Sequence, residues 1–166
     1  SLIKHVIPSM RGNFKNYGCA GVGNMDASLK TIGHPVDQVD VALNSRKHCI
    51  NCAAKEHGSY TSYNFDEQNN TCGRIKYFYW IFSYKQNFLD DNLGSAKRAF
   101  CQCDLAFVNA VEGKSTPNKS YDTTKCVANN SGGDGKCCKS PTGLYILFNS
   151  QKYQCCSGSV VSLGSC

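Results

Sequence analysis

The chain has 166 residues, enough for one domain, of which 41% are hydrophobic and 18% are charged. This balance excludes a charge-rich disordered chain. The longest strongly apolar run, from Tyr77 to Phe82, is too short to cross a bilayer, so we expect no transmembrane segment. The given sequence starts at Ser1, without a methionine and without a basic-then-apolar leader, so we expect a mature or trimmed chain.

Lysine and arginine number 18 against 12 acidic residues, which gives a net charge of +6. Basic residues occur in short runs, as at Arg46-Lys47 and Lys97-Arg98. Nucleic-acid binding needs a basic cluster on one element, so we expect no nucleic-acid partner. The positive balance instead favours weak attraction to anionic lipid, glycan or mineral surfaces.

Twelve cysteines, an even number, indicate disulfides and therefore an oxidising, extracellular compartment. Zinc is the alternative, because Cys49-x-x-Cys52 and Cys101-x-Cys103 have ligand-like spacing. No second knuckle follows at a regular distance, and adjacent cysteines chelate a single ion poorly. A secreted glycoprotein also agrees with three glycosylation sequons, which begin at Asn69, Asn118 and Asn129.

The first half of the chain predicts two helices around a loop. Residues 2–10 carry apolar positions at helical spacing, interrupted by Pro8, and glycines between Tyr17 and His34 predict a loop. A long helix is predicted over 36–57, after Pro35 and before Gly58. Its apolar face contains Val36, Val39, Leu43, Arg46, Cys49, Ile50 and Ala53.

The second half begins with a polar stretch over 60–73, which predicts an exposed loop. The aromatic residues of 75–84 predict a strand or a short hairpin. A second long helix is predicted from Asp90 to just before Gly113. Cys49 and Cys103 lie mid-face on the two long helices, as expected when a disulfide joins an antiparallel pair.

Residues 114–166 predict a Cys-rich extension that packs on the same domain as a core formed by 1–113. We therefore expect a mainly α, disulfide-rich fold. Cys19, Cys72 and Cys101 are expected to form disulfides as well. Spacing does not determine the partners of the remaining tail cysteines, Cys126, Cys137, Cys138, Cys155, Cys156 and Cys166.

Three groups of residues resemble a known family. Tyr17-Gly18-Cys19 precedes a glycine-containing loop, Pro35-Val36-Asp37-x-x-Asp40 begins the first long helix, and Cys101-x-Cys103-Asp104 lies in the second. Over roughly residues 16–110, the chain resembles secreted phospholipase A2. The resemblance implies a fold with two long antiparallel helices and a short β-hairpin, followed here by a disulfide-stapled C-terminal extension.

In that family a histidine on the first helix activates water, the aspartate beside it binds calcium, and an aspartate on the second helix orients the histidine. Counting from Cys49 puts Arg46 and Lys47 at the first two positions and Asp104 at the third. Arginine keeps its proton and cannot act as a base, and calcium needs carboxylate oxygens. The resemblance therefore implies a degenerate site without enzyme activity, calcium or any other cofactor.

The missing cysteines follow the same alignment. Ala42 and Leu43 replace two adjacent helix cysteines of the family, and Ala110 replaces the partner of the first. In the family, the second of these adjacent cysteines pairs with a cysteine of the calcium loop, and this chain lacks that loop cysteine as well. Both ends of each disulfide are lost together, which supports the alignment.

The retained Asp104 predicts a partly buried ion pair with Arg46 across the helices, and a solvated Arg46 is the alternative. A shift of two residues would make His48 the base, but it would leave Cys49 instead of an aspartate beside it. His34 is expected at the surface. These expectations depend on the resemblance and on no other pattern.

Three functions remain open. The first is lipid, fatty-acid or membrane-surface binding through the family's apolar channel and the aromatic run. The second is a structural or matrix role, although silent relatives in carbonate biominerals are acidic. The third is a calcium-dependent phospholipase with an unrecognised site. The candidate lipid-binding residues are Ile7, Tyr79, Trp80, Phe82 and Phe107.

Overall fold

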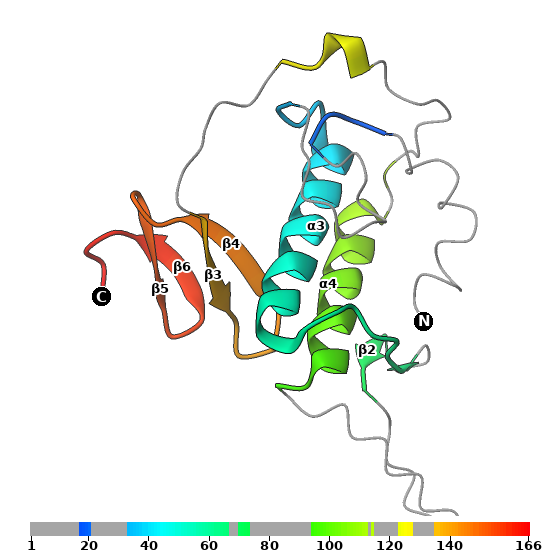
Figure 1. Cartoon of the computed structure of the whole chain (residues 1–166), viewed down its shortest axis with the longest axis vertical. Helices are drawn as coiled ribbons and strands as arrows, with labels where there is room; N and C mark the ends of the chain where they lie inside the picture. Colours follow the sequence, from blue (N-terminus) through cyan, green and yellow to red (C-terminus); the bar gives the residue numbers. More distant parts are fainter. Residues whose placement is uncertain are drawn as a thin grey trace, which may run out of the picture.

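The computed structural model describes residues 17–20, 33–66, 70–73, 94–112, 114, 123–127 and 135–166. At its centre, helix α3 (Gln38–His57) runs antiparallel to helix α4 (Ala96–Val111) (Figure 1). The expected helix over 2–10 and strand over 75–84 lie outside the described residues. So do Ile7, Asn69, Tyr79, Trp80, Phe82, Asn118 and Asn129.

Helix α3 ends where the sequence predicted and begins two residues later. The Asp37 side chain accepts a hydrogen bond from the Asp40 amide at 2.8 Å, so Asp37 is the N-cap and Pro35 precedes the helix. Gly58 ends it with a φ of 84° and donates its N–H to the Ala54 carbonyl.

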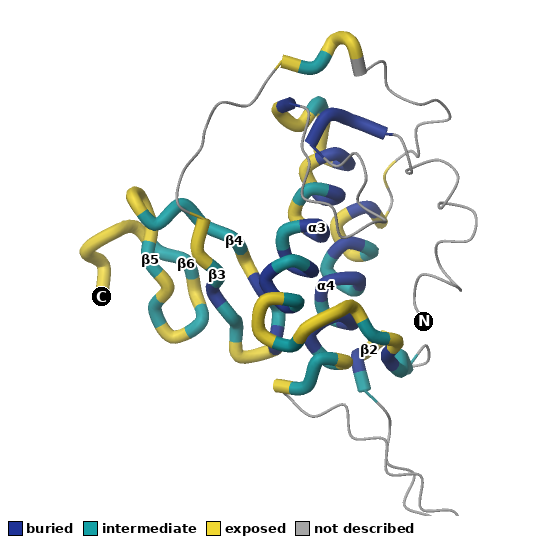
Figure 2. Tube along the Cα trace, viewed as in Figure 1, coloured by how far each residue is buried: buried dark blue, intermediate teal, exposed yellow. Residues whose placement is uncertain are grey.

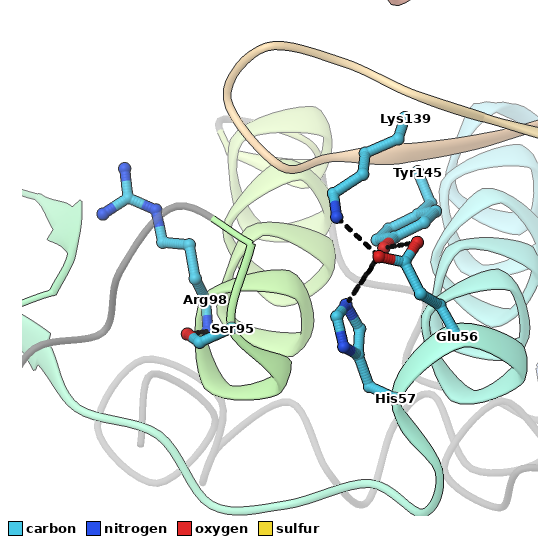
Figure 3. Close-up of polar contacts among 6 residues, drawn as sticks. All are labelled: Glu56, His57, Ser95, Arg98, Lys139 and Tyr145. Atoms are coloured by element: carbon cyan, nitrogen blue, oxygen red, sulfur yellow. Dashed lines mark hydrogen bonds and ion pairs between the residues drawn. The ribbon is translucent and has the colours of Figure 1, made fainter.

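Helix α4 begins later than expected. The helix was predicted to start at Asp90 and to include Gly94 and Ser95, but these two residues are not helical, so that part of the prediction was wrong. The Ser95 hydroxyl accepts from the Arg98 amide at 3.1 Å, which satisfies one of the free donors of the first turn (Figure 3). A hydroxyl cap, and not the acidic pair upstream, therefore defines this helix end.

The core lies where the two helices face each other. Leu43, Ala53 and Phe100 are almost completely buried, and Figure 2 shows buried segments concentrated on α3 and α4. The predicted disulfide between Cys49 and Cys103 is confirmed, with Cα atoms 5.6 Å apart. It joins the helices near their midpoints.

Strands are more numerous than expected. Strands β1 (Phe65–Asp66) and β2 (Thr71–Cys72) pair within the stretch predicted as a loop. The tail forms two antiparallel hairpins, β3 (Gly135–Lys139) with β4 (Tyr145–Asn149) and β5 (Tyr153–Cys156) with β6 (Ser159–Ser162). A short 3₁₀ helix, η1, covers Thr123–Lys125. The described fold is thus disulfide-rich and partly helical, and its strand content exceeds the expectation of a mainly α chain.

The β3–β4 hairpin lies against α3 (Figure 1). A disulfide between Cys52 and Cys137 fixes its first strand to the helix. At the helix end, the Glu56 carboxylate accepts hydrogen bonds from Lys139 at 2.8 Å and from the Tyr145 hydroxyl at 2.5 Å (Figure 3). His57 contacts the same hydroxyl at 3.0 Å. One covalent bond and one polar cluster therefore hold the tail on the helix pair.

All twelve cysteines are paired. Besides the two bridges above, the pairs are Cys19–Cys126, Cys72–Cys101, Cys138–Cys155 and Cys156–Cys166. Within the described ranges, neither helix is long and apolar enough to cross a membrane.

We predict that the Cys52–Cys137 bridge stabilises the fold more than the Cys156–Cys166 bridge. The first closes a sequence separation of 85 residues and involves a buried cysteine, whereas the second closes 10 residues and ends at an exposed one. Replacing Cys52 and Cys137 by alanine should cost about 2 kcal/mol more in urea unfolding than replacing Cys156 and Cys166. Equal losses would contradict the anchoring role of the first bridge.

Candidate functional site

Asp104 of α4 is fully buried and accepts three hydrogen bonds. The Arg46 guanidinium of α3 donates through Nε at 2.7 Å, and the hydroxyls of Tyr60 and Tyr63 donate at 2.8 and 2.5 Å. Arg46 is only 6% exposed. The predicted ion pair between the helices is therefore confirmed, and the alternative of a solvated Arg46 is wrong.

The two tyrosines are held as neutral donors. Burial raises the pKa of Tyr63 above its ordinary value of 10.0, and the adjacent charge of Asp104 raises it further. The same two causes, in the same order, raise the pKa of Tyr60. Each phenol therefore keeps its proton to a higher pH than a free tyrosine does, and its hydroxyl donates a hydrogen bond to the carboxylate.

A second buried carboxylate, Asp40, orients the segment 17–20. Its Oδ2 accepts from the amides of Cys19 at 2.8 Å, Ala20 at 3.1 Å and Val36 at 3.0 Å. Gly18 has a φ of +78°, and a Cβ there would overlap the Asp40 carboxylate. The close approach of this backbone to α3 therefore requires glycine at position 18.

Lys47 extends toward the same segment. Lys47 is 2% exposed, and its Nζ donates a hydrogen bond to the Ala20 carbonyl at 3.4 Å. Desolvation lowers the pKa of Lys47, while the charge of Asp40 acts in the opposite direction. The protein thus places a cationic side chain of its own beside the loop carbonyl and near a buried carboxylate.

None of the described side chains that are hydrogen-bonded to Asp104 is a histidine or another group that could act as a general base. Arg46 occupies the carboxylate and stays protonated. His48 lines the groove between the two helices and β4 that is described below. Its pKa is lowered mainly by burial and further by the nearby charge of Lys47. Among the described residues, no three side chains of the His, Cys, Asp or Glu type come together to hold a metal ion.

A groove of about 420 Å³ lies between α3, α4 and β4. Its lining is mainly apolar or small: Gln38, Val41, Ala42, Ser45, Arg46, His48, Cys49, Cys103, Ala106, Phe107, Ala110, Lys114, Leu144, Tyr145, Ile146 and Leu147. Phe107, a candidate lipid-binding residue, is 4% exposed and also packs into the core beside Leu43. The volume is typical of a site for a small organic ligand.

The structure brings Arg46 and Asp104 into contact, as the resemblance implied, and places the side chain of Lys47, a residue of α3, against the Ala20 carbonyl. Sequence analysis missed the contacts of Tyr60 and Tyr63 with Asp104. It placed both in an exposed loop, which is correct for Tyr60 at 42% exposure and wrong for Tyr63, which is buried. Their signal is two tyrosines three residues apart, directly after a helix stop at Gly58. It also missed the groove, which depends on the position of β4. His34 is exposed, as expected.

No family model, no curated protein and no solved structure matches this chain.

We predict that Asp104→Asn destabilises the protein by about 3–5 kcal/mol, because it leaves the Arg46 charge buried without its partner. The double variant Arg46→Gln, Asp104→Asn should recover at least about half of that loss, since both charges are removed and the tyrosines keep an acceptor. Glu112→Gln on the exposed end of α4 is the control and should change stability by less than about 0.5 kcal/mol. Urea unfolding of the oxidised protein measures all three, and strict additivity would contradict the coupling.

The raised pKa of Tyr63 gives a pH prediction. Above pH 10.0 the unfolded chain releases this proton and the folded chain keeps it, so the free energy of unfolding falls as the pH rises. Over the two pH units centred about that ordinary pKa, the total decline in Tyr63→Phe should be smaller by about 1.4 kcal/mol. Denaturant titrations between pH 9 and 11, about the tyrosine range, test this. Parallel slopes for the two proteins would refute it.

Proposed function

We propose that the protein is a secreted, non-catalytic relative of phospholipase A2 that binds lipid. The observation that carries the proposal is the buried Arg46–Asp104 ion pair, which lies where the resemblance puts a histidine and its orienting aspartate. A second support is the buried Lys47 beside the Ala20 carbonyl. Both positions thus hold cations that belong to the chain.

Hydrolysis by a family-type mechanism needs a base that releases a proton near neutral pH. Arg46 cannot fulfil this role, because its guanidinium stays protonated and is held by Asp104 at 2.7 Å. A calcium ion beside the loop would meet the Lys47 ammonium in place of a carboxylate ligand. Each replacement alone argues against turnover, and the two together argue more strongly.

Lipid binding is supported by what the helix pair keeps. The groove between α3, α4 and β4 has a largely apolar lining and a volume of about 420 Å³. The net charge of +6 adds attraction to anionic lipid. Six disulfides suit a protein that works in an oxidising compartment.

The test combines two assays on the full-length oxidised protein. Native mass spectrometry of protein purified from a eukaryotic secretion host should reveal a bound single-chain lipid, which denaturing conditions remove. Mixed phospholipid micelles with calcium should release no fatty acid above the rate without protein. Fatty-acid release would overturn the non-catalytic assignment. Salt-sensitive adsorption to mineral without any bound lipid would overturn lipid binding and favour a matrix role.

A further inference from the structure

The groove is an open apolar surface on the hairpin side of the helix pair. Two of its lining residues are among the exposed large apolar side chains, Val41 at 49% and Ile146 at 39%. They come from different elements, α3 and β4, which pack against each other. Apolar area exposed on both sides of one groove indicates a surface that a ligand can cover.

Small side chains make room for the groove. Ala42 lies seven residues before Cys49, and Ala110 lies seven residues after Cys103, which is about two turns along each antiparallel helix. Both alanines and Ala106 line the groove. The helices are joined at one end of it by the Cys49–Cys103 disulfide, so the space cannot close by sliding of the helices.

The charge of the lining has one sign. Two of the described residues that line the groove, Arg46 and Lys114, are cations, and none is an aspartate or glutamate. His48 also lines the groove, but burial lowers its pKa and favours the neutral ring. Arg46 is engaged with Asp104, and Lys114 is exposed just beyond the end of α4. The nearby acids, Asp37 and Glu112, cap the two helices and do not line the groove. An anion at this end would therefore meet Lys114 and the Gln38 amide.

We propose that this groove binds a single-chain lipid anion, with the carboxylate at Lys114 and the acyl chain along Ala42, Phe107 and Leu147. The inference rests on the proposed lipid-binding function and names its ligand class and its site. The helical span from Gln38 to Cys49 is about 16 Å, which suits an extended medium-length chain. His48, whose pKa is lowered by burial, forms part of the apolar wall and is not the head-group partner.

The probe is dodecanoate below its micelle concentration, titrated by calorimetry into the full-length oxidised protein. Val41→Asp places a carboxylate in the groove and should weaken binding at least tenfold. Val127→Asp is the matched control, because Val127 is 72% exposed and does not line the groove. It should bind like the unmodified chain. Ala110→Trp, which fills the groove from an exposed position without adding a charge, should also weaken binding at least tenfold.

The head-group position has its own test. Lys114→Glu should weaken dodecanoate binding several-fold and leave dodecyltrimethylammonium binding equal or stronger, since the tail is unchanged and the head charge is reversed. Lys55→Glu, an equal charge change on the exposed end of α3, should affect neither. Circular dichroism and mass spectrometry of the intact disulfides confirm that each variant is folded.

The outcomes separate the two proposals. Dodecanoate binding that is unchanged in both Val41→Asp and Ala110→Trp would overturn the groove assignment and leave lipid binding in place. Equal binding of the anionic and cationic probes would overturn the ligand class. Binding to anionic vesicles alone, insensitive to the groove variants, would overturn both parts of this inference. If no lipid of any kind binds the unmodified chain, the proposed function itself fails.

Discussion

The buried negative charge of Asp104 is the constraint on which the rest of the structure depends. A carboxylate in the interior is costly unless it is paired and hydrogen-bonded. Its three partners come from α3 and from the segment after α3, so satisfying it fixes α3, α4 and residues 60–63 relative to one another. The adjacent Cys103 binds Cys49 covalently, which places the disulfide next to the ion pair.

Asp40 repeats this principle on the other side of α3. It accepts three backbone amides and holds residues 19 and 20 against the helix, where Lys47 supplies a positive charge. Both carboxylates are thus balanced by groups of the chain itself.

Helical spacing was sufficient to predict the Cys49–Cys103 disulfide, because both cysteines lie mid-face on their helices. The Arg46–Asp104 ion pair was implied by the resemblance and not by spacing, and the structure confirms the contact. Helix ends were less predictable, because Ser95 caps α4 in preference to the acidic pair upstream. A side-chain cap depends on the local backbone, which composition does not reveal.

The rest could not be predicted, since it depends on tertiary placement. Tyr60 and Tyr63 lie in a loop, and their sequence does not indicate that the turn at Gly58 brings their hydroxyls to Asp104. The groove needs β4 beside α3, and that position follows from the Cys52–Cys137 bridge and the Glu56–Lys139 contact. Spacing alone left the partners of the tail cysteines open.

The most direct test of the central claim is calorimetric titration of calcium into the full-length oxidised protein at neutral pH. Lys47 lies beside the Ala20 carbonyl, and Arg46 is bonded to Asp104. We therefore predict no heat of binding and no change in the unfolding midpoint at millimolar calcium, which is about the weakest affinity of specific calcium sites in proteins. A stoichiometric calcium isotherm would contradict the account, since the two cations would then not exclude the metal ion.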